Sequence, residues 1–354
     1  MFERLDFSNF YSTNTAEREG FCRQLVSSLK QFGFARLVNI GIPPSDIDGA
    51  FETVEQPRSR EFFQLPLDQK LKSPHPPTAT PHRGYSAFGI ENVSAVSNHG
   101  TSVPRPLLKD MKESYDIGSP QDALYGNIWP PSGVHDTFQP TFTSFFTSCY
   151  RAELAILEAI SVGLGLPRQT LSQLHSEQSN ELRLTHYPAV PRGEFSHSTR
   201  IAAHTDFGTI TLLFQDDLAQ ISPTFHALSL PQLAFMRKLL TFSLEMELPS
   251  GSGEFVDIES GGRYECILNV GDCLQMWTGL CSARHRVHLP SLLAQEDQTG
   301  PMQDTVDERF SIAYFAKPNR AASLRPLLYD IAKAKDVSFM TAGEFQQMRI
   351  SGTY

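Results

Sequence analysis

One short stretch of the sequence carries side chains that can bind a metal ion. His204 and Asp206 are separated by a single residue within the β-prone stretch 203–213. In a β-strand, residues i and i+2 point to the same face, so both side chains can enter one site while Thr205 turns away. An imidazole and a carboxylate together suit Fe(II), Mn(II) or Zn(II). The same pair is also typical of a buried histidine bonded to a neighbouring aspartate, so a third ligand is needed to indicate a metal.

A third ligand is expected from a later strand. The stretch 282–290 offers two candidates, His285 and His288. These histidines are three residues apart, so on a strand they face opposite sides and only one can join His204 and Asp206. Two histidines and one carboxylate form the facial triad of non-haem Fe(II) oxygenases, which leaves positions on the metal open. Spacing alone does not choose between the two histidines.

A second alternating string, 308–315, carries a possible anion site. Arg309 and Ser311 share one face of this predicted strand, while Phe310 and Ile312 share the other. A planar guanidinium beside a hydroxyl is well suited to bind a carboxylate. A buried arginine without an anion is unfavourable, so its partner is either an acidic residue of the protein or a ligand. The sequence leaves these two alternatives open.

Composition excludes several classes of protein. The chain has 354 residues, of which 40% are hydrophobic and 19% are charged, with a formal net charge of -9. This is a globular composition, and it lacks the basic surface typical of proteins that bind nucleic acid or anionic membranes. The five cysteines contain no Cys-x-x-Cys pair, which fits a reducing compartment. With neither a signal peptide nor an apolar span recognisable, we expect a cytoplasmic protein.

The order of the predicted elements places these residues on a β-rich second half. Asn14 and Glu17 predict the start of a helix that ends at Gly33, and a strand is expected over 34–38. Further helices are expected near 45–65, over 139–163 and from Thr341, with a long loop over 72–110. Short strands, which suggest a sandwich or barrel, are predicted over 182–187, 209–214, 253–258, 264–270, 273–277, 285–289 and 309–315.

Ordered matches along nearly the whole chain give a more specific indication. They include Gly33-Phe34, Asn39-Ile40-Gly41-Ile42, Phe62-Phe63-Gln64-Leu65-Pro66 with Lys70, Arg83-Gly84-Tyr85, Lys112-Glu113-Ser114-Tyr115-Asp116, Asn127-Ile128-Trp129-Pro130, Leu182-Arg183-Leu184-Thr185-His186-Tyr187-Pro188 and Asn269-Val270-Gly271-Asp272. With the His-Thr-Asp, His-Arg-Val and Arg-x-Ser strings, the sequence resembles the isopenicillin N synthase-like branch of the Fe(II)/2-oxoglutarate-dependent dioxygenases. Ile40 stands where the family usually has histidine, and Thr185 where many relatives have asparagine.

This resemblance implies a fold and a set of site residues. The fold is α+β with a mainly β core, a double-stranded β-helix (jelly roll) with flanking helices. The metal ligands would be His204, Asp206 and His285, which resolves the choice against His288. Arg309 and Ser311 would bind the distal carboxylate of 2-oxoglutarate, and Tyr187 would help to hold this cosubstrate. Arg83 and Tyr85 would lie in a loop that borders the substrate pocket in relatives.

The resemblance also implies an activity. Fe(II), 2-oxoglutarate and O2 would together oxidise a small organic molecule by hydroxylation, desaturation or ring formation. The matches are most similar to fungal members, many of which act in secondary metabolism. Neither nucleic acid nor a membrane is expected as a partner. The sequence does not specify the substrate or the oligomeric state.

The expected organisation has three regions and one unusual segment. Residues 1–110 form an N-terminal α/β region, 111–325 the oxygenase core with its helix 139–163, and 326–354 a C-terminal helical region. Within the core, residues 219–243 interrupt a strand pair that is nearly continuous in relatives. This segment is either a genuine lid or packing element or a retained intron translated in frame, and we favour the intron.

Two other functions fit the same residues. An isopenicillin N synthase-like oxidase would keep the iron but not use 2-oxoglutarate, and Arg309 and Ser311 would then bind a substrate carboxylate. An inactive family member would keep the scaffold without turnover, as expected if residues 219–243 disrupt the barrel.

Overall fold

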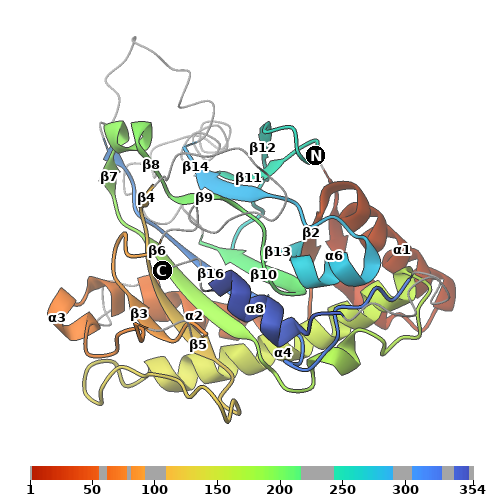
Figure 1. Cartoon of the computed structure of the whole chain (residues 1–354), viewed down its shortest axis with the longest axis horizontal. Coiled ribbons are helices and arrows are strands. Elements are labelled where there is room, and N and C mark those ends of the chain that lie inside the picture. Colours follow the sequence, from red (N-terminus) through yellow and green to blue (C-terminus); the bar gives the residue numbers. More distant parts are fainter. Residues whose placement is uncertain are drawn as a thin grey trace.

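Two β-sheets form the centre of the molecule. The computed structural model describes residues 2–55, 62–77, 81–91, 109–216, 243–289, 305–328 and 339–350. Within them, a mixed eight-stranded sheet has the order β1-β2-β13-β10-β16-β6-β5-β3, and a four-stranded sheet has the order β12-β11-β14-β9 (Figure 1). The strands are β1 Arg4–Asp6, β2 Phe34–Val38, β3 Gly84–Ser86, β4 Lys109–Asp110, β5 Glu113–Gly118, β6 Glu181–Tyr187, β7 Val190–Pro191, β8 Ser198–Thr199, β9 Ile201–His204, β10 Ile210–Gln215, β11 Ser243–Glu247, β12 Phe255–Asp257, β13 Cys266–Val270, β14 His285–His288, β15 Thr305–Val306 and β16 Arg309–Ala316.

Apolar side chains from both sheets meet between them. Phe34 on β2 and Ile267 on β13 belong to one buried cluster with Leu244 and Met246 on β11 and Val287 on β14. Burial of such residues is the main favourable contribution to folding, and here it holds the two sheets face to face. The polar residues of the candidate site occupy the same inter-sheet space.

Helices cover the other face of the large sheet. They are α1 Thr15–Phe32, α2 Pro44–Glu55, α3 Leu67–Lys70, α4 Phe138–Gly163, α6 Asp272–Thr278 and α8 Ala342–Ile350. α4 runs along this face (Figure 1), and its Phe145 and Phe146 pack against Phe214 of β10 and Tyr314 of β16, with ring centroids 5.5 and 5.3 Å apart. The sheet is therefore fixed from both sides.

The first helix begins and ends as the sequence predicts. The Asn14 side chain accepts hydrogen bonds from the backbone N–H groups of Ala16 and Glu17. Gly33 ends the helix at φ 73°, a conformation that favours glycine. A Cβ atom at Gly33 would lie 2.6 Å from the carbonyl oxygen of Cys281, so glycine also permits the close approach of these two segments.

Two predicted elements are wrong. The strand predicted over 273–277 is the helix α6, in which Cys273, Leu274 and Trp277 are buried on one helical face. The i, i+1 and i+4 spacing of these buried residues is helical, but so short an apolar run does not distinguish a helix from a buried strand. The helix predicted near 45–65 does not extend that far, because Phe62–Gln64 form a separate 3-10 helix; in the described residues α2 spans Pro44–Glu55. The helices predicted over 139–163 and from Thr341 are confirmed.

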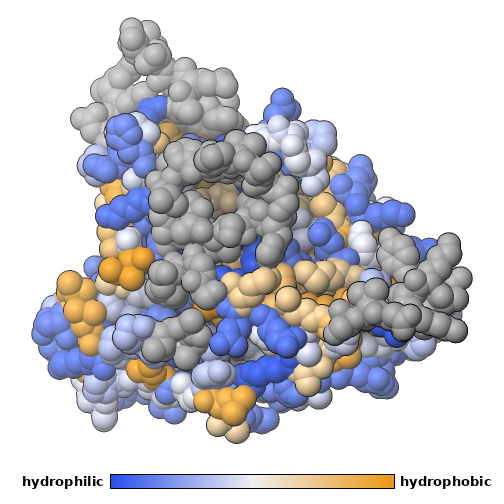
Figure 2. All heavy atoms as spheres, in the orientation of Figure 1, coloured by the Kyte–Doolittle hydropathy of each residue, from blue (hydrophilic) through white to orange (hydrophobic). Residues whose placement is uncertain are grey.

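The segment 219–243 lies outside the described residues except for Ser243, where β11 begins. The choice between a lid and a retained intron therefore stays a prediction. In the described part of the chain, no helix is long and apolar enough to cross a membrane. All five cysteines are free. Hydrophilic and hydrophobic residues are interspersed over the described part of the face shown in Figure 2.

Candidate active site

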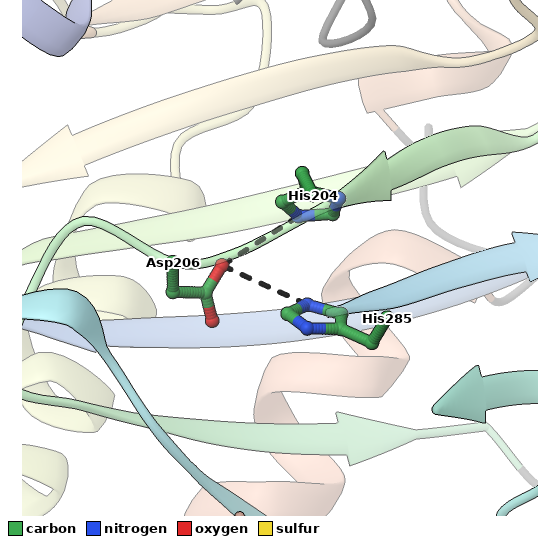
Figure 3. A group of neighbouring side chains, drawn as sticks. All are labelled: His204, Asp206 and His285. Atoms are coloured by element: carbon green, nitrogen blue, oxygen red, sulfur yellow. Dashed lines mark ion pairs between the residues drawn. The ribbon is translucent and has the colours of Figure 1, made fainter. Parts of the chain in front are cut away.

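His204, Asp206 and His285 come together at the end of the four-stranded sheet. β9 and β14 are antiparallel neighbours, and His204 lies directly opposite His285 in their register. Asp206 lies two residues beyond His204, just after β9 ends. Potential ligand atoms of the three side chains all lie within 4.8 Å of one another (Figure 3). His204 is the last residue of β9, and Asp206 lies beyond the end of this strand. The two side chains therefore share one site although one continuous strand does not carry both.

Backbone carbonyl groups fix which nitrogen of each histidine carries a proton. The Nδ1 atoms of His204 and His285 lie 2.8 Å and 3.2 Å from the carbonyl oxygens of Ala202 and Ala283. A carbonyl only accepts hydrogen bonds, so each Nδ1–H donates and each Nε2 keeps its lone pair. The Nε2 atoms lie 3.6 and 3.7 Å from Oδ1 of Asp206. Three electron-pair donors therefore face one point.

The surroundings keep Asp206 ionised and His285 neutral. Burial alone would raise the pKa of the Asp206 carboxyl, but the facing imidazoles of His285 and His204 and a hydrogen bond from Thr211 hold this pKa well below its usual range. Burial lowers the pKa of His285 to about 4, and the neighbouring His204 ring acts in the same direction. At neutral pH, Asp206 and His285 are therefore in the protonation states that bind a divalent cation.

Hydrogen bonds to the second carboxylate oxygen orient Asp206. Its Oδ2 accepts from the Thr211 hydroxyl at 2.5 Å and from Nδ2 of Asn269 at 2.7 Å. The carbonyl oxygen of Asp206 accepts from the N–H of Asp272 at 2.8 Å. Such outer hydrogen bonds fix ligand geometry in metal sites. The sequence contained Asn269 and Asp272 in a matched family string, but it gave no role to either residue or to Thr211.

His288 points away from this cluster, as strand alternation requires. Its Nδ1 lies 3.2 Å from the Thr199 hydroxyl, and its ring packs edge-on against Phe195. Among the described residues, His204, Asp206 and His285 form the one group of three or more potential ligands that can hold a metal ion. Two imidazoles and one carboxylate fit Fe(II) and leave its remaining positions open.

A buried cavity of about 90 Å³ between the two sheets adjoins the three residues. Arg309, Ser311 and Tyr187 line it together with His204 and Asp206. β16 and β6 pair so that Arg309 lies opposite Tyr187, and Ser311 lies opposite Thr185. Sheet register therefore brings the predicted anion-binding residues to one wall, while Phe310 and Ile312 pack in the core on the other face.

Arg309 has a protein acid nearby and also faces the cavity. Its Nε lies 3.5 Å from Oδ1 of Asp216, and both side chains are almost completely buried. Oδ2 of Asp216 accepts a hydrogen bond from the N–H of Phe310. Asp216 is thus the protein acid that pairs with Arg309, and the cavity offers the same side chain a place for a ligand. Burial raises the pKa of Tyr187, against the effect of the Arg309 charge, so the phenol stays protonated.

The loop residues expected near the substrate pair with acidic residues of the protein. Arg83 forms ion pairs with Asp122 and Glu181, at 3.2 and 3.7 Å, and Tyr85 donates a hydrogen bond to Glu113. Their neighbour His82 lines a second cavity. The loop thus reaches the site region through His82, which sequence reasoning missed.

This second cavity, of about 80 Å³, meets the first beside the candidate metal ligands His204 and Asp206. His204, Asp206, Arg183 and Phe315 line both cavities. The other described residues that line the second cavity are His82, Glu181, Thr205, Phe207, Gly208, Lys317 and Ile350. His204 and Asp206 therefore stand between two cavities of different chemistry, with Arg309 on one side and Lys317 and Glu181 on the other, while His285 lines the first cavity alone.

Comparisons with known proteins agree with this geometry. Residues 3–132 match the family model described as non-haem dioxygenase in morphine synthesis N-terminal. The chain is 38% identical to the proline hydroxylase buaE of Petromyces alliaceus over 358 residues, covering 99% of each chain. It is 35% identical to the 2-oxoglutarate-dependent dioxygenase htyE of Aspergillus rugulosus, covering 99% of this chain and 98% of the relative.

A solved structure from Neurospora crassa is similar over the same length. This full-length protein was crystallised in complex with alpha-KG, and it is 27% identical to the present chain. The two structures superpose with a TM-score of 0.77 over 99% of this chain and 96% of the Neurospora protein. The same Neurospora protein has also been solved with alpha-KG and thymine.

Proposed function

Because this chain belongs to the 2-oxoglutarate-Fe(II) oxygenases, we propose that His204, Asp206 and His285 hold its iron. Arg309 and Ser311, with Tyr187 opposite, bind the distal carboxylate of 2-oxoglutarate. The chain is a dioxygenase that uses Fe(II), 2-oxoglutarate and O2 to oxidise a small organic molecule. One observation supports the residue assignment: three potential ligand atoms converge beside a cavity that Arg309 also lines.

The protein residues act by holding and orienting. The Nε2 atoms of His204 and His285 and Oδ1 of Asp206 would supply three ligands to a bound Fe(II), and its remaining positions would stay available to other ligands. When bound, Fe(II) supplies the redox chemistry by which O2 oxidises the substrate while 2-oxoglutarate becomes succinate and CO2. The guanidinium of Arg309 offers a planar pair of donors to the cosubstrate carboxylate.

Asp216 and Tyr187 assist Arg309 from two sides. Asp216 fixes the guanidinium from behind, as a carboxylate close to Nε does. The protonated phenol of Tyr187 lies opposite Arg309 and can donate a hydrogen bond to the same ligand. The inter-sheet cavity keeps water away from these groups, which strengthens each charged contact.

The proposal also covers the type of β fold, the substrate and the cellular location. The two facing sheets form the double-stranded β-helix, or jelly roll, that the site requires. The substrate belongs to secondary metabolism, as the similarity to fungal dioxygenases suggests. The relative named as a proline hydroxylase makes free proline the first compound to test. A cytoplasmic location without a nucleic acid or membrane partner stays a prediction.

Succinate formation tests this function without knowledge of the substrate. Succinate is the same product whichever molecule is oxidised, so the wild type with Fe(II), 2-oxoglutarate, O2 and a panel of candidate substrates is expected to release succinate that mass spectrometry can quantify. Asp206→Ala removes the carboxylate ligand and is expected to abolish this release. An iron-loaded wild type that forms no succinate, alone or with candidate substrates, would contradict the use of 2-oxoglutarate and favour the isopenicillin N synthase-like oxidase.

A further inference from the structure

The second cavity holds a buried ion pair that lies beside the metal-binding cluster. Nζ of Lys317 donates to Oε2 of Glu181 at 2.9 Å, and the two side chains are 10% and 3% exposed. Both residues line the cavity that His204 and Asp206 also line. Lys317 directly follows β16, and its backbone N–H donates to Asn180, which fixes its position. Charged groups thus face the space that remains once 2-oxoglutarate fills the first cavity.

The ammonium group of Lys317 has more N–H donors than it uses among the described residues. An ammonium group carries three N–H donors, and among the described residues Glu181 is the one acceptor that Nζ of Lys317 reaches. Arg183, which lines the same cavity, is instead committed to two carboxylates. Its guanidinium makes four hydrogen bonds, which go to Asp116 and Glu91. The donors directed at an incoming molecule therefore belong to Lys317.

A buried pair elsewhere in the chain shows what a purely structural role looks like. Lys70 and Glu113 lie 2.7 Å apart, with side chains that are 10% and 5% exposed, so their burial matches that of Lys317 and Glu181. Lys70 also donates to the carbonyl oxygen of Phe63 and lies over the ring of Tyr85. Its charge is satisfied within the protein, and it does not line the cavities described above.

The Glu181 carboxylate is shared by several side chains. Glu181 is approached by Lys317, by Nδ1 of His82 at 3.2 Å and by Arg83 at 3.7 Å. Arg83 shares Asp122 with Arg320. Arg83 therefore has a second carboxylate partner that does not line the cavity, whereas Lys317 pairs with Glu181 alone among the described residues. An anionic group in the cavity would meet the ammonium group of Lys317, and it must be of limited size because the cavity is small.

We propose that this cavity binds a free amino acid, whose carboxylate accepts from Lys317 and whose ammonium group donates to Glu181. An α-amino acid carries both charges on neighbouring atoms, so it extends the existing ion pair into an alternating set of four charges. The inference rests on the proposed function, since it names the substrate class of that same site. Phe207, Phe315 and Ile350 supply apolar walls, which leave the side-chain carbons of the amino acid to face the metal ligands.

Calorimetric titration of the Fe(II)- and 2-oxoglutarate-loaded protein with the common L-amino acids, without O2, tests the proposal. At least one of them is expected to bind saturably. Its methyl ester, which lacks the carboxylate charge, and its analogue without the amine are expected to bind about 10- to 100-fold more weakly. For L-proline, the amine-free analogue is cyclopentanecarboxylate. The proposal is wrong if no amino acid binds, or if the methyl ester binds as tightly as the amino acid itself. It is also wrong if thymine, the ligand in one of the Neurospora structures, binds better than every amino acid.

Variants assign the binding to the ion pair. Lys317→Met and Glu181→Gln are expected to weaken amino-acid binding about 10- to 100-fold, with partial recovery in Lys317→Arg. Lys70→Met removes an ion pair of the same burial and is expected to leave the dissociation constant unchanged. Equal losses of amino-acid affinity in Lys317→Met and Lys70→Met would overturn the role of Lys317. If a variant does not fold, the ester and the amine-free analogue still test the proposal on the wild-type protein. Amino-acid binding that depends on Lys317 in a protein that never forms succinate would retain this inference and reject the proposed function.

Discussion

At the residue scale, the proposed role of Arg309 is to select the anion that the inter-sheet cavity accepts. Arg309 is 3% exposed, contacts Asp216 through Nε and lines the cavity. The carboxylate of Asp216 offsets part of the cost of burying this charge. A dicarboxylate cosubstrate can then take the two parallel donors that a guanidinium presents.

Substitution of Arg309 tests this assignment. Arg309→Met is expected to raise the dissociation constant for 2-oxoglutarate about 10- to 100-fold, because a charge-assisted contact to its distal carboxylate is lost. Arg309→Lys keeps the charge but not the planar pair of donors, so an intermediate value is expected. The constant can be measured by anaerobic titration of the iron-loaded protein. Arg286→Met serves as control, since Arg286 pairs with Glu245. Unchanged affinity in Arg309→Met would place the cosubstrate elsewhere.

Single residues also show where sequence reasoning reaches its limit. Strand alternation correctly separated His285 from His288, because side chains three residues apart on a strand face opposite sides. It did not choose between them, since that choice depends on the register of β14 against β9, which places His285 opposite His204. Register between strands so far apart in the sequence is set by packing of the whole sheet. Here the family resemblance supplied the choice.

At the scale of elements, the C-terminal helix α8 reaches the turn that carries Asp206. Arg349 on α8 forms an ion pair with Asp272 at 2.9 Å, and its guanidinium lies 4.2 Å from the ring centre of Phe207. Its Nη2 atom also donates to the Thr205 hydroxyl at 3.4 Å. Thr205 and Phe207 flank Asp206 in the chain. A distant helix therefore positions a candidate metal ligand without contacting the metal.

Loss of this support is expected to weaken metal binding. Arg349→Met should raise the dissociation constant for Fe(II) about 10-fold, as is typical when outer contacts of a metal site are removed. Arg349→Lys should recover part of the affinity. Anaerobic calorimetry with Fe(II) alone measures the effect independently of turnover. Arg168→Met, which breaks an ion pair with Glu158 on α4, is the control. Wild-type iron affinity in Arg349→Met would show that α8 has only a packing role.

The elements were largely predictable where local signals are strong. Asn14 and Gly33 bound α1 because capping depends on adjacent residues alone. The helix α6 was missed because seven residues give too short a pattern to separate helix from buried strand. The role of α8 was also beyond prediction, since the contact of Arg349 with Asp272 depends on the packing of the whole chain.

At the scale of the whole molecule, His186 connects the N-terminal region to the strand that carries Arg309. Its Nδ1 lies 2.7 Å from Glu113 on β5, and its Nε2 lies 3.1 Å from Glu308, next to Arg309. Burial alone would lower the pKa of His186, but the hydrogen bonds to Glu113 and Glu308 outweigh it and raise this pKa. Lys70 binds the same Glu113, so the cluster joins α3, β5 and β6.

This cluster predicts a pH dependence of stability. The native pKa of His186 is raised, so the native state binds the proton more tightly than the unfolded state does. The resulting stabilisation is complete below the unfolded pKa of about 6.5 and is lost as pH rises through the native pKa. The free energy of unfolding in urea should therefore fall more steeply with rising pH, from about 6 to about 9, in the wild type than in His186→Gln. Equal pH profiles for the two proteins would contradict this linkage.

The prediction of the family and of the cofactors was correct. The division of the chain into three regions stays a prediction. An α+β fold with a large sheet and flanking helices follows from the order of strong local patterns. The described N-terminal strands β1 and β2 pair directly into the large sheet, a long-range contact that local patterns do not reveal. The origin of residues 219–243 stays a prediction that the sequence of the transcript can test.

The most direct test of the central claim is the visible metal-to-ligand charge-transfer band of an Fe(II)–2-oxoglutarate chelate, recorded without O2. The wild type and His288→Ala are expected to show the band, because His288 faces Thr199 and Phe195 instead of Asp206. His285→Ala is expected to lose it, because the Nε2 atom that faces Asp206 is removed. A band that survives in His285→Ala, or a wild type that binds iron and 2-oxoglutarate without forming it, would contradict the proposed site.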